Sequence, residues 1–357
     1  MWKNELTKLL KVQYPIIQAP MAGGITTSEL VAAVSNAGGL GMIGAGYMNP
    51  EQVLLQIKEV KQLTDKPFGV NLFVPSPFEV DKEKLQYTKT LLRPIIEELD
   101  AEVERELPNF EEEQHAFHKQ LNILMEEKVP ICSFTFGVPP INAIRKLKEK
   151  GIVLIGTATT VSEAILNEKS GMDAVVVQGS EAGGHRGTFH HENKNSLIGL
   201  MSFIPQAADH LMIPIIAAGG IMDGRGLMAA KCLGARGVQM GSAFLVCDES
   251  GAIQVYKEAI LHATEDQIVL TKAFSGKMAR GINNHFIEKM KYDEIRLPDY
   301  PIQNELTKAI RKKSATMGNP ENMSLWSGQS PRLSKKMKAS ALIKSIISEV
   351  EGIRAKL

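Results

Sequence analysis

The chain has 357 residues, and its 41 lysines and arginines balance 40 aspartates and glutamates, giving a formal net charge of +1. Hydrophobic residues make up 44% and charged residues 23% of the chain, which excludes disordered and fibrous proteins. The near-zero charge also argues against nucleic acid as a partner, because phosphate binding needs clustered lysine and arginine. The three cysteines (Cys132, Cys232 and Cys247) are odd in number and lack CxxC spacing, so we expect neither a disulfide framework nor a structural zinc site.

Apolar runs in the sequence are short. None approaches the roughly 18 apolar residues that a membrane span needs. Segment 1–15 lacks the long apolar core and the small-residue cleavage site of a secretory signal. We therefore expect a soluble, cytoplasmic protein that has no membrane partner.

The apolar runs are bounded by glycine or proline and are continuous rather than alternating, which is typical of parallel strands buried on both faces. In chain order they predict strands at 14–19, 40–44, 68–73, 131–135, 153–157, 174–178, 214–218 and 237–240. Helical patterns lie between most of them, at 28–37, 50–63, 140–150, 161–168 and 226–233. Eight strands alternating with helices predict an α/β fold, the TIM (β/α)8 barrel. An open doubly wound sheet gives the same alternation and is the alternative.

Two segments depart from this rhythm. Segment 76–128 is rich in Glu, Lys and Leu and predicts two or more amphipathic helices outside the barrel. Segment 246–329 follows the eighth strand and reads as a mainly helical subdomain inserted at that point. We therefore expect a barrel over 1–245 with the helical insert 76–128, then the subdomain over 246–329, and then a C-terminal helix within 330–357 that closes the barrel.

Glycine-rich turns follow the seventh and eighth predicted strands. Gly219 and Gly220 end the seventh, and the run Gln239, Met240, Gly241 and Ser242 ends the eighth. In an α/β barrel these two positions favour phosphate groups, because glycine lets backbone N–H donors approach an anion closely. The sequence therefore predicts a site for a phosphate-bearing cofactor at this end of the barrel.

The loop after the sixth strand carries ionisable side chains among four glycines. It contains Glu181, His185 and Arg186 directly beyond a buried strand. A histidine in such a loop has little packing of its own, so we expect His185 to be catalytic and to take or donate a proton near neutral pH. The adjacent His190 and His191 point in different directions and lack a metal-binding spacing, and we expect no metal site.

Five segments together closely resemble nitronate monooxygenases, formerly called 2-nitropropane dioxygenases. They are 14–24 (YPIIQAPMAGG), 35–41 (SNAGGLG), 69–73 (GVNLF), 178–187 (QGSEAGGHRG) and 218–221 (AGGI), and the resemblance continues at 275–280 and 325–329. The EAGGHRG stretch is specific to this superfamily. A histidine in a similar loop also occurs in the flavin-dependent enoyl-acyl-carrier-protein reductase, which uses FMN and NAD(P)H and is the alternative.

The resemblance implies an FMN enzyme that oxidises alkyl nitronates with O2 to carbonyl compounds and nitrite. It leaves open whether neutral nitroalkanes are also used, and it does not identify the physiological substrate. The partners expected are a small-molecule nitronate and O2, and the oligomeric state is open, a homodimer being one expectation. Carried over by position, His185 is catalytic, and the FMN contacts are Met21, Ala22, Asn71, Gln178, Gly183, Gly219, Gly220, Gln239, Met240, Gly241 and Ser242.

Overall fold

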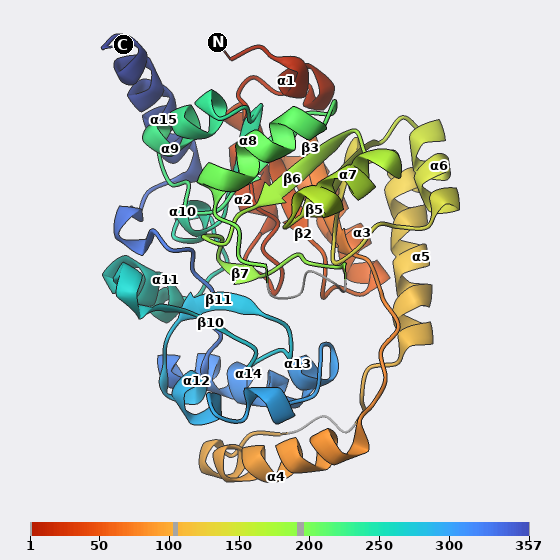
Figure 1. Ribbon diagram of the computed structural model, residues 1–357, viewed down its shortest axis with the longest axis vertical. Helices are drawn as coiled ribbons and strands as arrows, with labels where there is room; N and C mark the ends of the chain where they lie inside the picture. The colour runs from red at the N-terminus through yellow and green to blue at the C-terminus, as the bar shows by residue number, and fades with distance from the viewer. Residues whose placement is uncertain (1, 103–105, 191–195, 357) are drawn as a thin grey trace.

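The computed structural model describes residues 2–102, 106–190 and 196–356. Its centre is an eight-stranded parallel sheet in the order β1-β9-β8-β6-β5-β4-β3-β2, closed into a barrel (Figure 1). The strands are β1 (Ile16–Gln18), β2 (Gly41–Gly44), β3 (Phe68–Phe73), β4 (Ile131–Thr135), β5 (Val153–Ala158), β6 (Ala174–Gln178), β8 (Ile215–Ala218) and β9 (Gly237–Met240). The predicted TIM barrel is confirmed, and all eight strands lie within two residues of their predicted bounds.

The barrel closes between β1 and β2, where the backbone pairing is short. Leu40 N donates to Ile16 O at 2.9 Å, and Gln18 N donates to Leu40 O at 3.0 Å. The buried side chain of Gln18 then continues the pairing, because its Oε1 accepts from Met42 N at 3.0 Å and its Nε2 donates to Met42 O at 3.2 Å. A side-chain amide therefore satisfies backbone groups that a longer strand would have paired.

A ring of helices surrounds the strands. It consists of α2 (Ser28–Asn36), α3 (Pro50–Leu63), α5 (Phe110–Glu126), α6 (Ile141–Glu149), α7 (Val161–Lys169), α8 (Leu200–His210), α9 (Gly224–Cys232) and α15 (Ala339–Arg354). Polar caps fix several starts; the Thr27 side chain accepts from Leu30 N, and Asn49 and Gln52 form a capping box. Helix α1 (Glu5–Leu10) closes the amino end of the barrel, where its Leu6 and Leu10 pack into the strand interior.

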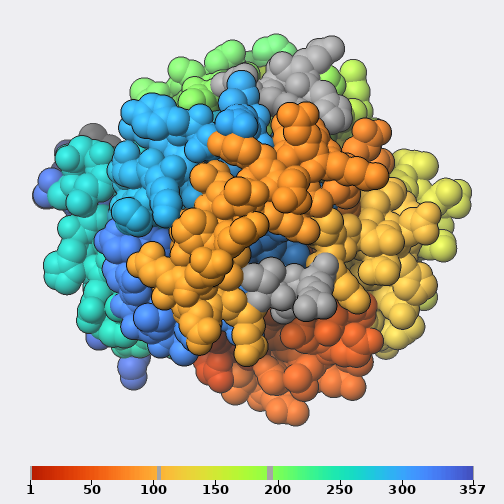
Figure 2. All heavy atoms as spheres, turned by 90° about the horizontal axis from the view of Figure 1, so that it is seen from below, coloured from red at the N-terminus to blue at the C-terminus, as the bar shows by residue number. Residues whose placement is uncertain are grey.

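The insert 76–128 is divided between the two parts of the molecule. Helix α5 packs beside α3 and α6 and so belongs to the helix ring. Helix α4 (Lys82–Leu99) instead leaves the barrel and lies across the far face of the subdomain (Figures 1 and 2). Its Leu92, Ile95 and Leu99 share one hydrophobic cluster with subdomain residues. The insert therefore joins the barrel to the subdomain.

Segment 246–329 holds a small sheet as well as helices. Its elements are α11 (Gln254–His262), η2 (Glu265–Gln267), β10 (Ile268–Thr271), β11 (Ala279–Ile282), α12 (His285–Met290), η3 (Glu294–Arg296), α13 (Ile302–Leu306), α14 (Lys308–Met317) and η4 (Pro320–Asn322). Antiparallel β10 and β11 extend to β7 (Gly184–His185), which comes from the loop after β6. These three strands were not predicted from the sequence. They tie the subdomain to the loop that carries His185.

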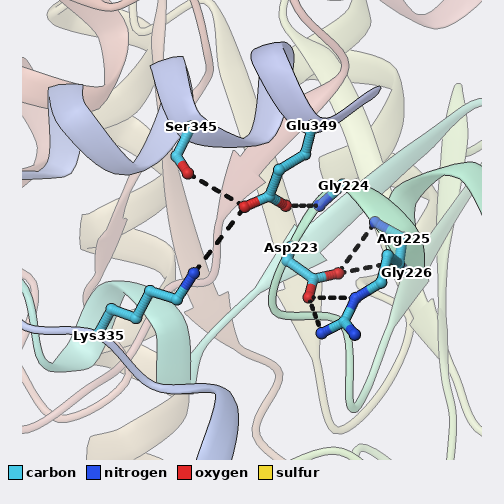
Figure 3. A network of polar contacts seen from close by, with 7 residues as sticks. All are labelled: Asp223, Gly224, Arg225, Gly226, Lys335, Ser345 and Glu349. Carbon is cyan, nitrogen blue, oxygen red and sulfur yellow. Dashed lines mark hydrogen bonds and ion pairs between the residues drawn. The ribbon is translucent and has the colours of Figure 1, made fainter. Parts of the chain in front are cut away.

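Helix α15 completes the helix ring between α9 and α2. Figure 3 shows that Glu349 of α15 reaches the start of α9, where its Oε2 accepts from Gly224 N at 2.8 Å. Asp223 caps the same helix by accepting from the N–H groups of Arg225 and Gly226 at 2.9 and 3.2 Å. Two carboxylates of the chain therefore occupy the N-terminus of α9.

In the described part of the chain, no helix combines the length and the apolar character that crossing a bilayer requires.

Candidate active site

A cavity lies between the carboxyl ends of the barrel strands and the small sheet, and we call it the active-site cavity. The predicted site residues that line it are Met21, Ala22, Asn71, Gln178, Gly183, His185, Gly219, Gly220, Gln239, Gly241 and Ser242. The structure thus gathers these residues from the ends of five strands and the loops that follow them, as expected for a barrel active site.

Met240 is the exception among the predicted residues. Its side chain is 1% exposed and packs in the hydrophobic layer between strands and helices. Because side chains alternate along a strand, Gln239 faces the cavity and Met240 faces the helices. The Met240 side chain therefore does not face the cavity, and the cofactor contact predicted at Met240 stays a prediction.

His185 is held in one orientation by the subdomain. It lies on β7 opposite Ala279 of β11, and its Nε2 lies 2.8 Å from Ser275 Oγ. The Ser275 hydroxyl donates its own proton to Lys277 O at 3.0 Å, so it accepts from His185 Nε2–H. This assigns the proton of the neutral imidazole to Nε2 and leaves Nδ1 as an acceptor.

The electrostatic surroundings keep this imidazole uncharged. Burial lowers the pKa of His185 from 6.5 to about 3, and the nearby charges of Lys277 and Arg311 contribute to the same decrease. The two cations come from the subdomain. Their positive potential disfavours imidazolium and at the same time favours an anionic ligand in the cavity.

Gln178 and Arg186 hold the loop that carries His185. Gln178 Nε2 donates to His185 O at 2.9 Å, and its Oε1 accepts from Gly187 N at 2.8 Å. The buried Arg186 guanidinium donates to the carbonyl oxygens of Gln178 and Gly179 at 3.1 and 2.7 Å. Arg186 therefore fixes the end of β6, and Gln178 has one amide N–H left for a ligand.

The turns after β8 and β9 form one end of the cavity. Gly219 and Gly220 have φ values of +136° and +63°, a region that glycine adopts readily. Ser242 is the first residue of α10 (Ser242–Leu245). Its Oγ accepts from Gly328 N at 2.9 Å, so the hydroxyl proton stays available to a ligand. Carboxylates already accept from the first N–H groups of α9. Donors for an anion therefore come from the turns after β8 and β9 and not from the N-terminus of α9.

Close backbone approaches explain two further glycines. A Cβ on Gly183 would lie 2.5 Å from Gly328 N, so the glycine lets segment 325–329 cross the loop after β6. A Cβ on Gly44 would lie 2.6 Å from the Met21 carbonyl carbon and 2.8 Å from Ala22 N. Gly44 therefore allows the Met21–Ala22 backbone to lie against the end of β2 and border the cavity.

Asn71 is buried at the end of β3, where it is paired with Gly44 of β2. Its Nδ2 donates to Ser133 Oγ at 2.9 Å and to Thr135 Oγ1 at 3.1 Å. These two bonds orient the amide, while Oδ1 has only a 3.5 Å contact with Thr135 and can accept from a ligand.

Several residues around His185 were not predicted from the sequence. Trp326, Phe136 and Tyr300 surround His185 with ring centroids 5.3, 6.0 and 6.2 Å from the imidazole. Trp326 and Ser275 lie in segments that the family resemblance had already singled out, and Phe136 directly follows a predicted strand. Tyr300 has no such signal, because its role depends on a contact that forms only in the folded chain.

Among the described residues, no three His, Cys, Asp or Glu side chains cluster in a way that could hold a metal ion. His190 lines a neighbouring cavity, whereas His191 lies outside the described residues.

Known proteins resemble this chain over almost its full length. A family model described as nitronate monooxygenase matches residues 3–349. A probable nitronate monooxygenase from Staphylococcus haemolyticus (strain JCSC1435) is 51% identical over 356 residues, or 99% of each chain. The crystal structure of a nitroalkane oxidase from Streptomyces ansochromogenes has a TM-score of 0.90 at 36% identity and covers 98% of this chain and 99% of its own. FabK from Thermotoga maritima has a TM-score of 0.79 at 33% identity, covering 100% and 98%. The chain belongs to the nitronate monooxygenase family and is an oxidoreductase.

Proposed function

We propose that this chain is an FMN-dependent nitronate monooxygenase, which oxidises alkyl nitronates with O2 to carbonyl compounds and nitrite. The observation that carries the proposal is the neutral His185 imidazole, fixed by Ser275 and flanked by the cations Lys277 and Arg311. This arrangement favours an anionic substrate at a group that can accept a proton. The similarity to a nitroalkane oxidase supports the same substrate class.

The residues of the cavity fit FMN. Gly219, Gly220, Gly241 and the Ser242 hydroxyl would hold its phosphate, because this end offers donors without a charged side chain. Met21, Ala22, Asn71, Gln178, Gly183 and Gln239 would contact the isoalloxazine and ribityl groups. Bound FMN would supply the electron-transfer chemistry that no side chain provides.

The side chains of this protein bind, orient and shield the substrate. Lys277 and Arg311 draw a nitronate toward the cavity through their positive potential. Where a neutral nitroalkane enters, His185 Nδ1 is the acceptor for its α-proton, since Nε2 keeps its own proton on Ser275. The rings of Phe136, Tyr300 and Trp326 around the imidazole exclude water.

Two assays on the purified protein test this proposal. Denaturation should release a flavin that chromatography identifies as FMN, and ethyl nitronate should drive O2 consumption with stoichiometric nitrite and no need for NAD(P)H. Release of FAD, or the absence of flavin, would overturn the cofactor assignment. NAD(P)H oxidation with a crotonyl thioester and no O2 consumption with nitronate would instead establish the enoyl reductase alternative. The cytoplasmic location and the homodimer stay part of the proposal, and size-exclusion chromatography with light scattering decides the latter.

A further inference from the structure

A second cavity adjoins the active-site cavity on the side of the insert and the subdomain, and we call it the antechamber. Its walls are mixed. Apolar side chains include Met48, Val74, Phe78, Phe117, Phe189 and Met278, and charged side chains such as Glu113, Lys272 and Asp299 line other parts of it. Three aromatic side chains, Tyr47, Phe73 and Phe136, border both cavities. These rings therefore form the partition between the cavity where His185 lies and the antechamber, whose wall includes the apolar side chains of Met48, Val74 and Phe117.

Phe136 is the ring of this partition that lies beside His185. Its centroid is 6.0 Å from the imidazole, 4.5 Å from Phe73 and 5.6 Å from Tyr300. Lys277 Nζ lies 4.8 Å from the same centroid, a cation–π contact. With 8% of its surface exposed, the ring is held on several sides, so it is a fixed wall.

The backbone of Phe136 is unusual in a way that core packing does not require. Its φ is +71°, in the left-handed region that disfavours bulky side chains. The other non-glycine residues with positive φ among the described residues are Lys11, Asp100 and Lys128, and each directly follows a helix or its cap. Phe136 instead follows β4 at the carboxyl end of the barrel. Strain of this kind persists where the surrounding structure enforces it, and such positions cluster at active sites.

We propose that Phe136 limits the length of the substrate chain by closing the active-site cavity toward the antechamber. The inference rests on the proposed function in taking a nitronate as the substrate. A short alkyl chain fits between Phe136 and the opposite wall, whereas a longer chain meets the ring. Removal of the ring joins the two cavities and lets a longer apolar chain extend among Met48, Val74 and Phe117.

A pair of matched variants tests this role. Phe136→Gly removes the ring and also suits the positive φ, so the fold is not burdened by new strain. Phe78→Gly removes the same ring from the antechamber wall, at a described position that borders only the antechamber. The measured quantity is the ratio of kcat/KM for 1-octyl nitronate to kcat/KM for ethyl nitronate, on enzyme normalised for flavin content.

The ratio should rise about tenfold or more in Phe136→Gly, the scale on which a pocket discriminates single methylene groups. It should stay within about threefold of wild type in Phe78→Gly. Phe136→Leu, which keeps part of the bulk, should give an intermediate ratio and serves if the glycine variant folds poorly. An unchanged ratio in both Phe136 variants, or an equal rise in Phe78→Gly, would overturn the proposal.

A binding measurement separates this inference from the proposed function. Trp326 lines the active-site cavity, so its fluorescence in a Trp2→Phe background, recorded in the absence of O2, reports the binding of nitroalkanes to the holoenzyme. The Kd ratio of nitrooctane to nitroethane should fall about tenfold or more when Phe136 becomes Gly. If no nitronate is turned over, the proposed function fails, but this Kd ratio still decides the role of Phe136.

Discussion

Replacement of His185 by Asn should affect the two forms of a nitro substrate differently. In the structure the Nε2 proton of His185 is committed to Ser275, at a distance of 2.8 Å, and Nδ1 has a lone pair but no proton. Oxidation of a neutral nitroalkane needs that lone pair, because the substrate must first lose the proton on its α-carbon to a base. A preformed nitronate has already lost the proton, and the imidazole has no free donor to offer it.

The size of each effect follows from these roles. For the nitroalkane, loss of a general base costs about 10²–10⁴-fold in kcat/KM, and we expect a value near the lower limit. The reason is that a pKa of about 3 makes His185 a weak base, below its usual 6.5 by an amount equivalent to about 5 kcal/mol. For the nitronate, which receives no hydrogen bond from the imidazole, only the His185–Ser275 hydrogen bond that fixes the ring is lost; at about 0.5–1.5 kcal/mol this corresponds to roughly 2–13-fold.

Oxygen consumption with ethyl nitronate and with nitroethane, on flavin-normalised enzyme, gives the two ratios directly. His262→Asn is a suitable control, since His262 is exposed on α11 and bonds only to the Glu258 carbonyl in the described chain. FMN content should match wild type in both variants. Equal losses on the two substrate forms would refute the assignment of Nδ1 as the base.

Three further outcomes are expected. Ser275→Ala should lower kcat/KM for nitroethane about 2–13-fold, because the hydrogen bond that keeps the proton on His185 Nε2 is lost. Ser275→Thr keeps a hydroxyl and should restore kcat/KM. Loss of all activity in both variants would contradict this role of Ser275. Gly241→Val should lower the fraction of enzyme that retains FMN while circular dichroism stays normal, because Gly241 has an ordinary φ of −101° and its Cβ would meet only Ala19 at 3.7 Å. The folded-state pKa of His185 is depressed, so the unfolded chain takes up its proton first as the pH falls from 6.5 toward 3, and stability is lost in that window. Between pH 7 and pH 5, urea unfolding should show a loss about 2 kcal/mol larger in wild type than in His185→Asn.

The barrel could be predicted because each strand carries its own signal. Runs such as 174–178 are apolar throughout, and burial on both faces of a parallel sheet requires this. Strands β7 and β11 have no comparable signal. Ala279–Ile282 is a strand because it pairs with Ile268–Thr271, and Gly184–His185 is a strand because it pairs in turn with Ala279 and Arg280 across the fold. Intrinsic preference does not predict such pairing, since it depends on long-range contacts.

The candidate site was predictable to the same extent. Glycines and amides at strand ends, such as Gly220 and Asn71, could be placed because the barrel brings all carboxyl ends of its strands together. The residues that orient His185 and contribute to its lowered pKa could not be predicted. Ser275, Lys277 and Arg311 come from the subdomain. Ser275 lies 90 residues after His185 and the other two lie further along, so no local pattern links them to the loop after β6.

The pairing of β7 with β11 also has a consequence for the order in which the protein is made. The ribosome completes all eight barrel strands by Met240, yet the two-residue β7 has no partner strand until Ala279–Ile282 has been synthesised. The segment that crosses Gly183 arrives later still, with Ser327 and Gly328. A nascent chain that ends near residue 245 can therefore form the barrel strands. It still lacks β11, which pairs with β7, and Trp326 and Gly328, which line the active-site cavity. The fixed orientation of His185 is therefore a property that the chain acquires only after residue 282 has been synthesised.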